Sequence, residues 1–185
     1  MNKKLSAMRL CSGRAWLCAI VVAFALMPDV GQAQHAHPSV QNAAPTVGSP
    51  AIPFELRTLD GKAISLGSFG GKPLVINFFA TWCDPCREEM PLTNDLAVQA
   101  ATNDYSILAV AVEDSRAAVT QYAKESKLVF PIALDLNSTV KRAYRIFGPP
   151  ATFFIDRRGI IRDIVIGPLT RERSSTALTN AGVRK

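Results

Sequence analysis

Apolar and polar residues follow two different patterns in the predicted strands of this chain. Two nearly continuous apolar runs, Leu74–Ala80 and Ile107–Val112, are typical of strands that are buried on both faces of a sheet. Apolar residues instead alternate with polar ones in Phe54-Glu55-Leu56 and Ile64-Ser65-Leu66, which flank a turn at Asp60-Gly61. This second pattern predicts a β-hairpin that precedes the first buried strand.

Amphipathic segments and shorter apolar runs fill the rest of the chain. The expected helices are Asp84–Ala101, Ser115–Lys127, Ser138–Phe147 and Thr170–Ala181, and the remaining expected strands are Phe130–Leu134, Thr152–Ile155 and Ile160–Ile166, the last two forming a second hairpin. Pro91 should bend the first helix, and Ser115 should cap the second. Strands that alternate with helices and then end in a hairpin and a helix predict an α/β fold with a central mixed β-sheet flanked by helices.

The first 33 residues have the pattern of an export signal. Four basic residues precede the apolar stretch Ala15–Met27, and Gly31 and Ala33 supply the small residues of a cleavage site. The 13 residues of the stretch are short for a membrane span, which needs ~20; an uncleaved signal anchor is the alternative. We therefore expect a periplasmic or otherwise exported protein that is soluble after cleavage, or membrane-anchored if the signal is retained.

Cleavage would change both the cysteine count and the charge. Cys11 and Cys18 would leave with the signal, so that Cys83 and Cys86 remain as one close pair. The signal holds four of the 21 basic and one of the 15 acidic residues, so the formal charge falls from +6 to +3. This charge is too mild to predict binding to nucleic acid or to a membrane surface.

Two further segments follow the predicted signal. Residues 34–49 are polar and aperiodic and are interpreted as a flexible linker. Residues 50–185 are enough for one domain with its own hydrophobic core.

The candidate chemistry lies in Trp82-Cys83-Asp84-Pro85-Cys86, between a predicted strand and a predicted helix. Two cysteines separated by two residues at a helix start indicate reversible dithiol–disulfide chemistry. The unpaired N–H groups at the helix start favour a thiolate at Cys83, which we expect to be exposed and to attack first. Cys86, one turn inside the helix, is then placed to resolve the mixed disulfide.

A zinc site is the main alternative for this cysteine pair. Zinc needs four ligands, and the other candidate ligands in the mature chain, His35 and His37, lie in the predicted linker. We therefore expect no metal and no cofactor apart from the redox-active Cys83–Cys86 disulfide.

Several dispersed motifs give the chain a recognisable resemblance. They are Leu59-Asp60-Gly61-Lys62, the run from Val75 through Cys86, Glu89-Met90-Pro91, and the run from Gly148 through Asp156. Over about residues 48–182 the chain resembles the exported thioredoxin-like proteins of the TlpA/ResA family. The resemblance implies a thioredoxin-like fold with an N-terminal β-hairpin extension. It also implies reduction of disulfides in client proteins, apocytochrome c among them, with re-reduction by a membrane thiol-reductant donor.

The resemblance also implies roles for residues around the cysteines. Pro150 matches the cis-proline that faces the disulfide in thioredoxin-like folds, and the preceding Pro149 lacks the N–H that would pair with a bound client. Trp82 is expected to shield the disulfide and contact clients. Asp84 and Pro85 are expected to set the redox poise, because a carboxylate beside Cys83 opposes the thiolate and makes the pair a stronger reductant.

A proton-transfer group is harder to assign. Asn77 lies six residues before Cys83, where thioredoxin carries a buried acid, and an asparagine does not titrate. Glu113 and Asp114 follow the strand Ile107–Val112 and should reach the same edge of the sheet, with Asp114 the best match for the family's active-site glutamate; a solvated helix-capping pair is the equal alternative. Arg87, Glu88 and Glu89 are interpreted as a solvated helix face.

Three other functions compete with disulfide reduction. A disulfide oxidase would run the same steps in reverse, and the acid and proline between the cysteines argue against it. A peroxiredoxin-like peroxidase would need a proline and a hydroxyl residue where the chain has Ile76 and Ala80. A copper-binding chaperone of the same fold would use a histidine inside the domain, which the sequence lacks.

Overall fold

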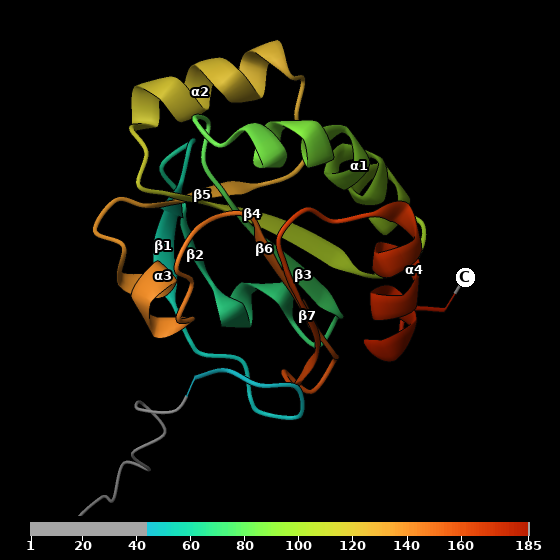
Figure 1. Ribbon diagram of the computed structural model, residues 1–185. Helices are drawn as coiled ribbons and strands as arrows, with labels where there is room; N and C mark the ends of the chain where they lie inside the picture. The colour runs from blue at the N-terminus through green and yellow to red at the C-terminus, as the bar shows by residue number, and fades with distance from the viewer. Residues whose placement is uncertain (1–43, 185) are drawn as a thin grey trace, which may run out of the picture. The chain divides into compact units, whose positions relative to one another are not determined.

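The computed structural model describes residues 44–184, in which strands and helices alternate (Figure 1). The strands are β1 Glu55–Thr58, β2 Ala63–Ser65, β3 Leu74–Phe79, β4 Ser106–Val112, β5 Ile132–Asp135, β6 Ala151–Ile155 and β7 Ile161–Ile166. The helices are α1 Asp84–Ala100, α2 Arg116–Glu125, α3 Thr139–Ala143 and α4 Arg171–Asn180, with a short 3₁₀ helix, η2, at Leu66–Phe69. The predicted signal, Cys11, Cys18, His35 and His37 lie outside the described residues.

One mixed sheet of seven strands forms the centre, in the order β2-β1-β5-β4-β3-β6-β7. β3 pairs in parallel with β4, and β4 with β5, whereas β6 and β7 run antiparallel to their neighbours. The β1–β2 hairpin extends the sheet at one edge through antiparallel pairing of β1 with β5. The expected α/β fold with an N-terminal hairpin is therefore confirmed.

Side-chain alternation along β3 separates two hydrophobic cores. Val75 and Phe79 face one core with side chains from α1, α2 and α4, and Ile76 and Phe78 face the other with side chains from α3. Figure 1 shows α1 and α2 on one side of the sheet and α3 on the other. Because successive strand residues point to opposite faces, Asn77 lies on the same face as Val75 and Phe79, beneath α1.

The helices largely follow the expected pattern. Ser115 accepts a hydrogen bond of 3.1 Å from the Ala118 N–H and caps α2 as predicted. α1 continues through Pro91 and changes direction along its length in Figure 1. α3 is shorter than predicted because the chain leaves the helix at Tyr144 and Arg145 takes a positive φ of 54°.

The start of the domain also differs from expectation. Gly48 N–H donates to Ile161 O at 2.8 Å, and Ile161 N–H donates to Ser49 O at 2.9 Å. These last two positions of the predicted linker are therefore tied to β7. Along residues 44–184, no helix is both long and apolar enough to cross a bilayer.

Candidate functional site

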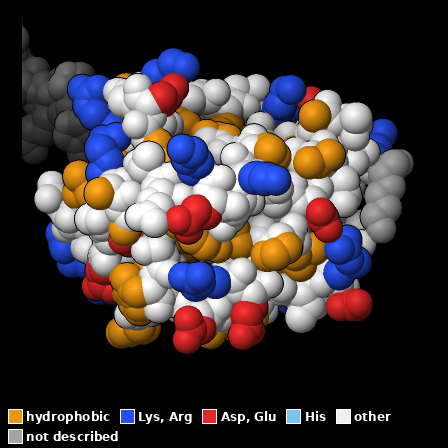
Figure 2. Space-filling model, turned by 90° about the horizontal axis from the view of Figure 1, so that it is seen from above, with side chains coloured by type: hydrophobic (Ala, Val, Ile, Leu, Met, Phe, Trp, Pro, Cys, Tyr) orange, Lys and Arg blue, Asp and Glu red, His pale blue; other side chains and the backbone are white. Residues whose placement is uncertain are grey.

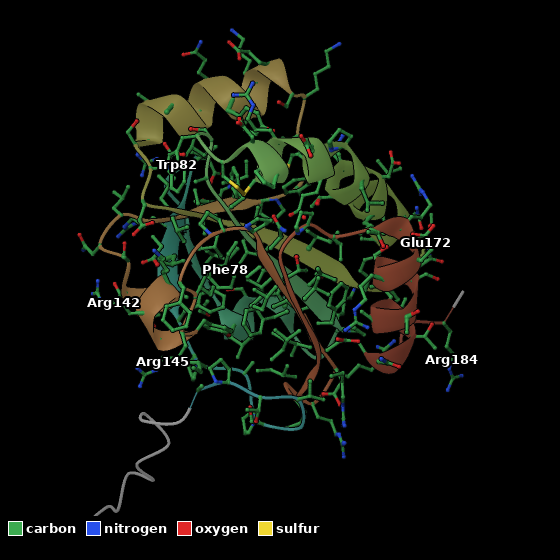
Figure 3. All side chains as sticks on the ribbon, viewed as in Figure 1. Phe78, Trp82, Arg142, Arg145, Glu172 and Arg184 are labelled. Carbon is green, nitrogen blue, oxygen red and sulfur yellow. A yellow bond between two sulfur atoms is a disulfide. The ribbon has the colours of Figure 1, made fainter. Side chains whose placement is uncertain are left out.

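A disulfide joins Cys83 and Cys86 at the point where β3 ends and α1 begins (Figure 3). Cys83 is the N-cap residue of α1, and its Sγ accepts a hydrogen bond of 3.2 Å from the Cys86 N–H. Sulfur thus occupies the position where a capping side chain normally satisfies a free helix N–H. The same contact, together with the helix dipole, would stabilise a thiolate on Cys83 after reduction.

The two cysteines differ little in exposure. Cys83 is 5% exposed and Cys86 is fully buried. Our expectation of an exposed Cys83 is therefore wrong for the disulfide state, in which the loop before β6 lies against the residue through the Pro149 carbonyl. Cys83 remains the sulfur that solvent reaches more easily, so the assignment of Cys83 as the attacking thiol stays a prediction.

Asp84 and Pro85 form the first helical positions between the cysteines. Both are exposed, and Asp84 is the acidic residue of the first turn. Proline is tolerated there because its missing N–H would have no partner inside the helix. Their influence on the redox poise stays a prediction.

The loop before β6 faces the disulfide. The peptide bond between Pro149 and Pro150 is cis, as expected for Pro150. The Pro149 carbonyl oxygen lies 3.6 Å from Cys83 Sγ, and the Pro150 carbonyl accepts a hydrogen bond of 3.0 Å from the Gly167 N–H. This loop is therefore held between the disulfide and the β7–α4 connection.

Trp82 and the two acids after β4 form one connected group. Trp82 is 57% exposed, and its Nε1 donates to the Glu113 backbone oxygen at 3.0 Å. The Glu113 carboxylate pairs with Lys141 Nζ at 2.6 Å. Asp114 accepts hydrogen bonds from the Thr81 N–H at 2.6 Å and the Ser115 N–H at 2.8 Å. The Asp114 carboxylate and the Glu113 backbone oxygen thus hold the loop that carries Trp82, while the Glu113 carboxylate is engaged with Lys141.

The structure reveals a third acid that sequence reasoning placed wrongly. Arg87 and Glu88 are exposed as expected, but Glu89 is only 4% exposed. Glu89 lies three positions after Cys86, so both project from the buried face of α1. That helical spacing was the available signal, and the neighbouring charges concealed it. Burial raises the pKa of the Glu89 carboxyl, while hydrogen bonds from Leu169 and Asn77 oppose the rise.

Three hydrogen bonds hold Glu89 and Asn77 in place. Asn77 Nδ2 donates to Glu89 Oε1 at 2.8 Å and to Thr152 Oγ1 at 3.0 Å. The Leu169 N–H donates to Glu89 Oε2 at 2.5 Å. Asn77 and Thr152 are directly opposed in the β3–β6 ladder and fully buried. This group connects α1, the centre of the sheet and the strand that follows the cis-proline.

Exposed apolar side chains are available for contacts with other proteins. Phe147 is 99% exposed, three positions before Pro150, and Ile166 is 73% exposed opposite Ala151 at the end of β7. In Figure 2, hydrophobic side chains lie in patches between basic and acidic side chains. Within residues 44–184, no three His, Cys, Asp or Glu side chains are grouped so as to hold a metal ion.

Comparison with known proteins gives a consistent family assignment. The sequence profile of the AhpC/TSA family matches residues 47–164. The chain is 35% identical over 152 residues to thiol-disulfide oxidoreductase ResA of Geobacillus thermodenitrificans, covering 82% of this chain and 87% of that protein. It is also 35% identical over 134 residues to the thioredoxin-like protein YneN of Bacillus subtilis, covering 71% and 78%.

A solved structure agrees with these sequence relatives. The crystal structure of a thiol:disulfide interchange protein of the thioredoxin family from Chlorobium tepidum has a TM-score of 0.66 and 30% sequence identity. The match covers 75% of this chain and 99% of that one. The central sheet and its helices are therefore those of a thioredoxin-like fold.

Proposed function

Because the chain belongs to the AhpC/TSA family and resembles the ResA-like thiol-disulfide oxidoreductases, we propose that it works as a reductase of disulfides in exported client proteins. The observation that carries the proposal is the Cys83–Cys86 disulfide at the start of α1, with Cys83 Sγ as the N-cap acceptor and the cis-proline loop against it. No other cysteine occurs in residues 44–184, so within this part of the chain the pair has no further thiol with which to exchange.

The proposed reaction starts from the dithiol form. The Cys83 thiolate attacks one sulfur of the client disulfide, a mixed disulfide forms, and the other client sulfur leaves as a thiolate that takes up a proton. Cys86 then loses its proton and attacks Cys83 Sγ, which releases the second client sulfur as a thiolate. Two electrons pass from Cys83 and Cys86 to the client, both client thiolates take up protons in place of those that the two cysteines release, and an external dithiol must restore the reduced pair.

Glu89 is the group that supports proton removal from Cys86. Cys86 is fully buried, so solvent cannot take its proton directly. Glu89 lies one turn further along the same buried helix face, and its raised pKa brings its titration closer to neutral pH. Glu113 and Asp114 are engaged with Lys141 and with backbone N–H groups, which favours Glu89 over either acid.

The cellular setting is part of the same proposal. The predicted signal supports export, and the resemblance to the TlpA/ResA family supports apocytochrome c as one client and a membrane thiol-reductant as the donor. The Asp84-Pro85 dipeptide favours reduction over oxidation. A disulfide oxidase of the same fold would have a higher reduction potential at its cysteine pair. The measured potential therefore distinguishes disulfide reduction from disulfide oxidation.

Insulin reduction by the purified domain tests the activity. Wild-type protein should reduce insulin with dithiothreitol as donor, and Cys83→Ser should abolish this activity. Cys86→Ser should instead accumulate a mixed disulfide with a client, because the resolving thiol is missing. If Cys83→Ser accumulates the mixed disulfide and Cys86→Ser releases clients normally, the roles of the two cysteines are reversed.

A further inference from the structure

The Asn77 side chain is buried, and one end of its amide has no partner. Its Nδ2 makes both available hydrogen bonds, to Glu89 Oε1 and Thr152 Oγ1. Its Oδ1 finds no hydrogen-bond donor in the described part of the chain. A buried polar atom without a partner is costly, so this orientation persists only if the bonds at the other end require it.

An ionised Glu89 supplies that requirement. A carboxylate accepts hydrogen bonds only, so the amide must present its amino group to Oε1. The Leu169 N–H already occupies Oε2 at 2.5 Å, which leaves Oε1 as the oxygen where an added proton is best accommodated. A proton on Oε1 would face the Asn77 N–H that donates there and find no acceptor.

Rotation of the Asn77 amide removes this conflict. With the amide turned over, Oδ1 accepts from the protonated Glu89 and from the Thr152 hydroxyl, which donates or accepts equally well. One end of the amide is unpaired in either orientation. The proton on Glu89 therefore decides which orientation is more stable.

The same contacts reach the loop that faces the disulfide. Thr152 lies two residues after the cis-proline, on β6. Leu169, which holds Oε2, lies two residues after Gly167, whose N–H donates to the Pro150 carbonyl at 3.0 Å. Both oxygens of Glu89 are thus connected to segments that support Pro150.

We propose that Asn77 is a positioning residue whose amide turns over when Glu89 gains a proton. The protonation state of Glu89 is thereby transmitted to Thr152, which follows the cis-proline loop that faces the disulfide. The proposal rests on the proton-accepting role of Glu89 in the proposed function. In that reaction the proton comes from Cys86 as its thiolate attacks Cys83. Client release then coincides with a change in the hydrogen bonds of β6.

The charged side chains near Glu89 have other partners, so its hydrogen bonds with Asn77 and Leu169 are the contacts that respond to its protonation. On α1, Arg87 is exposed, with its guanidinium 5.5 Å from the Tyr122 ring, and Asp95 is exposed and paired with Arg171 of α4 at 3.0 Å. From β3, β6 and the β7–α4 connection, the groups that face Glu89 are the Asn77 amide, the Thr152 hydroxyl behind it and the Leu169 N–H. No charged side chain acts on the Glu89 pKa among the described residues.

Nuclear magnetic resonance on the wild-type protein tests the proposal without any substitution. The Asn77 side-chain amide resonances should shift with pH, with the same midpoint as the Glu89 carboxyl carbon. Asn180 is the matched control in the same sample, because its Nδ2 donates at 3.0 Å to Asp163, which is also paired with Arg173. The Asn180 resonances should stay fixed through the Glu89 titration. Asn77 resonances that do not move while Glu89 titrates would overturn the proposal.

A pair of variants gives an independent measurement. Asn77→Leu removes a hydrogen bond from both protonation states, and the proton affinity of Glu89 should rise roughly fivefold, because the bond lost by the charged carboxylate is stronger than the one lost by its protonated form. Asn180→Leu should leave the Glu89 midpoint unchanged. An unchanged Glu89 midpoint in folded Asn77→Leu would also contradict the proposal. If the wild-type protein failed to reduce insulin while the Asn77 and Glu89 resonances still titrated with one midpoint, only the proposed function would be contradicted.

Discussion

Two buried carboxylates in this domain accept a hydrogen bond from an asparagine, and their surroundings differ in one respect. Asp163 on β7 accepts from Asn180 and is paired with the Arg173 guanidinium. Glu89 on α1 accepts from Asn77 and forms no ion pair with any residue between 44 and 184. A counter-ion favours the ionised form of a buried carboxylate, whereas burial without a counter-ion favours uptake of a proton. The difference supports the proposal that Glu89, three positions after Cys86 on the buried face of α1, takes part in the reaction.

Exchanging each acid for its amide should separate the two roles most strongly. Glu89→Gln should slow client reduction by on the order of 10²-fold, because the variant cannot accept a proton from Cys86. Asp163→Asn should leave the rate unchanged and lower the free energy of unfolding by about 1–3 kcal/mol, since Arg173 loses its partner. Stopped-flow insulin reduction and urea unfolding measure the two effects. Equal rates for Glu89→Gln and wild type would remove Glu89 from the mechanism.

The pH dependence of stability should show the same contrast. Glu89 has a pKa raised above 4.5 in the folded state, so the folded protein binds more protons than the unfolded chain between 4.5 and the folded value. Stability should therefore fall as the pH rises through this window. The fall should vanish in Glu89→Gln and persist in Asp163→Asn. Asp60, whose pKa is lowered to about 2 by Lys62, acts in the opposite direction at lower pH, from 3.8 downwards.

Urea unfolding at several pH values measures this slope. The comparison uses the difference between Glu89→Gln and wild type, which cancels the contributions of all other acids. A difference that is constant from pH 4 to pH 8 would mean that Glu89 titrates as it does in the unfolded chain.

A smaller effect on the rate of client reduction is expected at Pro149, in the loop before β6. Pro149 has no N–H to pair with an extended client, and one missing main-chain hydrogen bond is worth on the order of 1 kcal/mol. Pro149→Thr should restore the donor and speed insulin reduction several-fold, while discrimination between clients declines. The rates on insulin and on a folded client, with the reduction potential measured in parallel, decide this. An unchanged or slower insulin rate at constant potential would show that the position does not limit client access.

Much of this architecture could be predicted from local pattern. The continuous apolar runs correctly indicated β3 and β4, and Asp60-Gly61 correctly indicated the β1–β2 turn, where Gly61 adopts a φ of 84°. The position of the disulfide followed from the strand, the helix and the two cysteines. These features depend on residues that are close in sequence.

The features that were missed depend on contacts between distant segments. Glu89 looks exposed beside Arg87 and Glu88, and only the packing of α1 on the sheet buries it. Its contact with Leu169 spans 80 positions of sequence. Residues 46–49 resemble a linker in composition, yet backbone hydrogen bonds from Gly48 and Ser49 join them to β7. Composition does not reveal a backbone pairing of this kind.

The midpoint potential of the Cys83–Cys86 pair tests the central claim, disulfide reduction, most directly. Equilibration against glutathione or thioredoxin buffers, followed by thiol alkylation, gives the value. We predict a potential nearer thioredoxin's ~−270 mV than the oxidant extreme of about −120 mV, because Asp84 opposes the Cys83 thiolate and no histidine lies in the domain. A value in the oxidant range would contradict the account and assign the protein to disulfide formation.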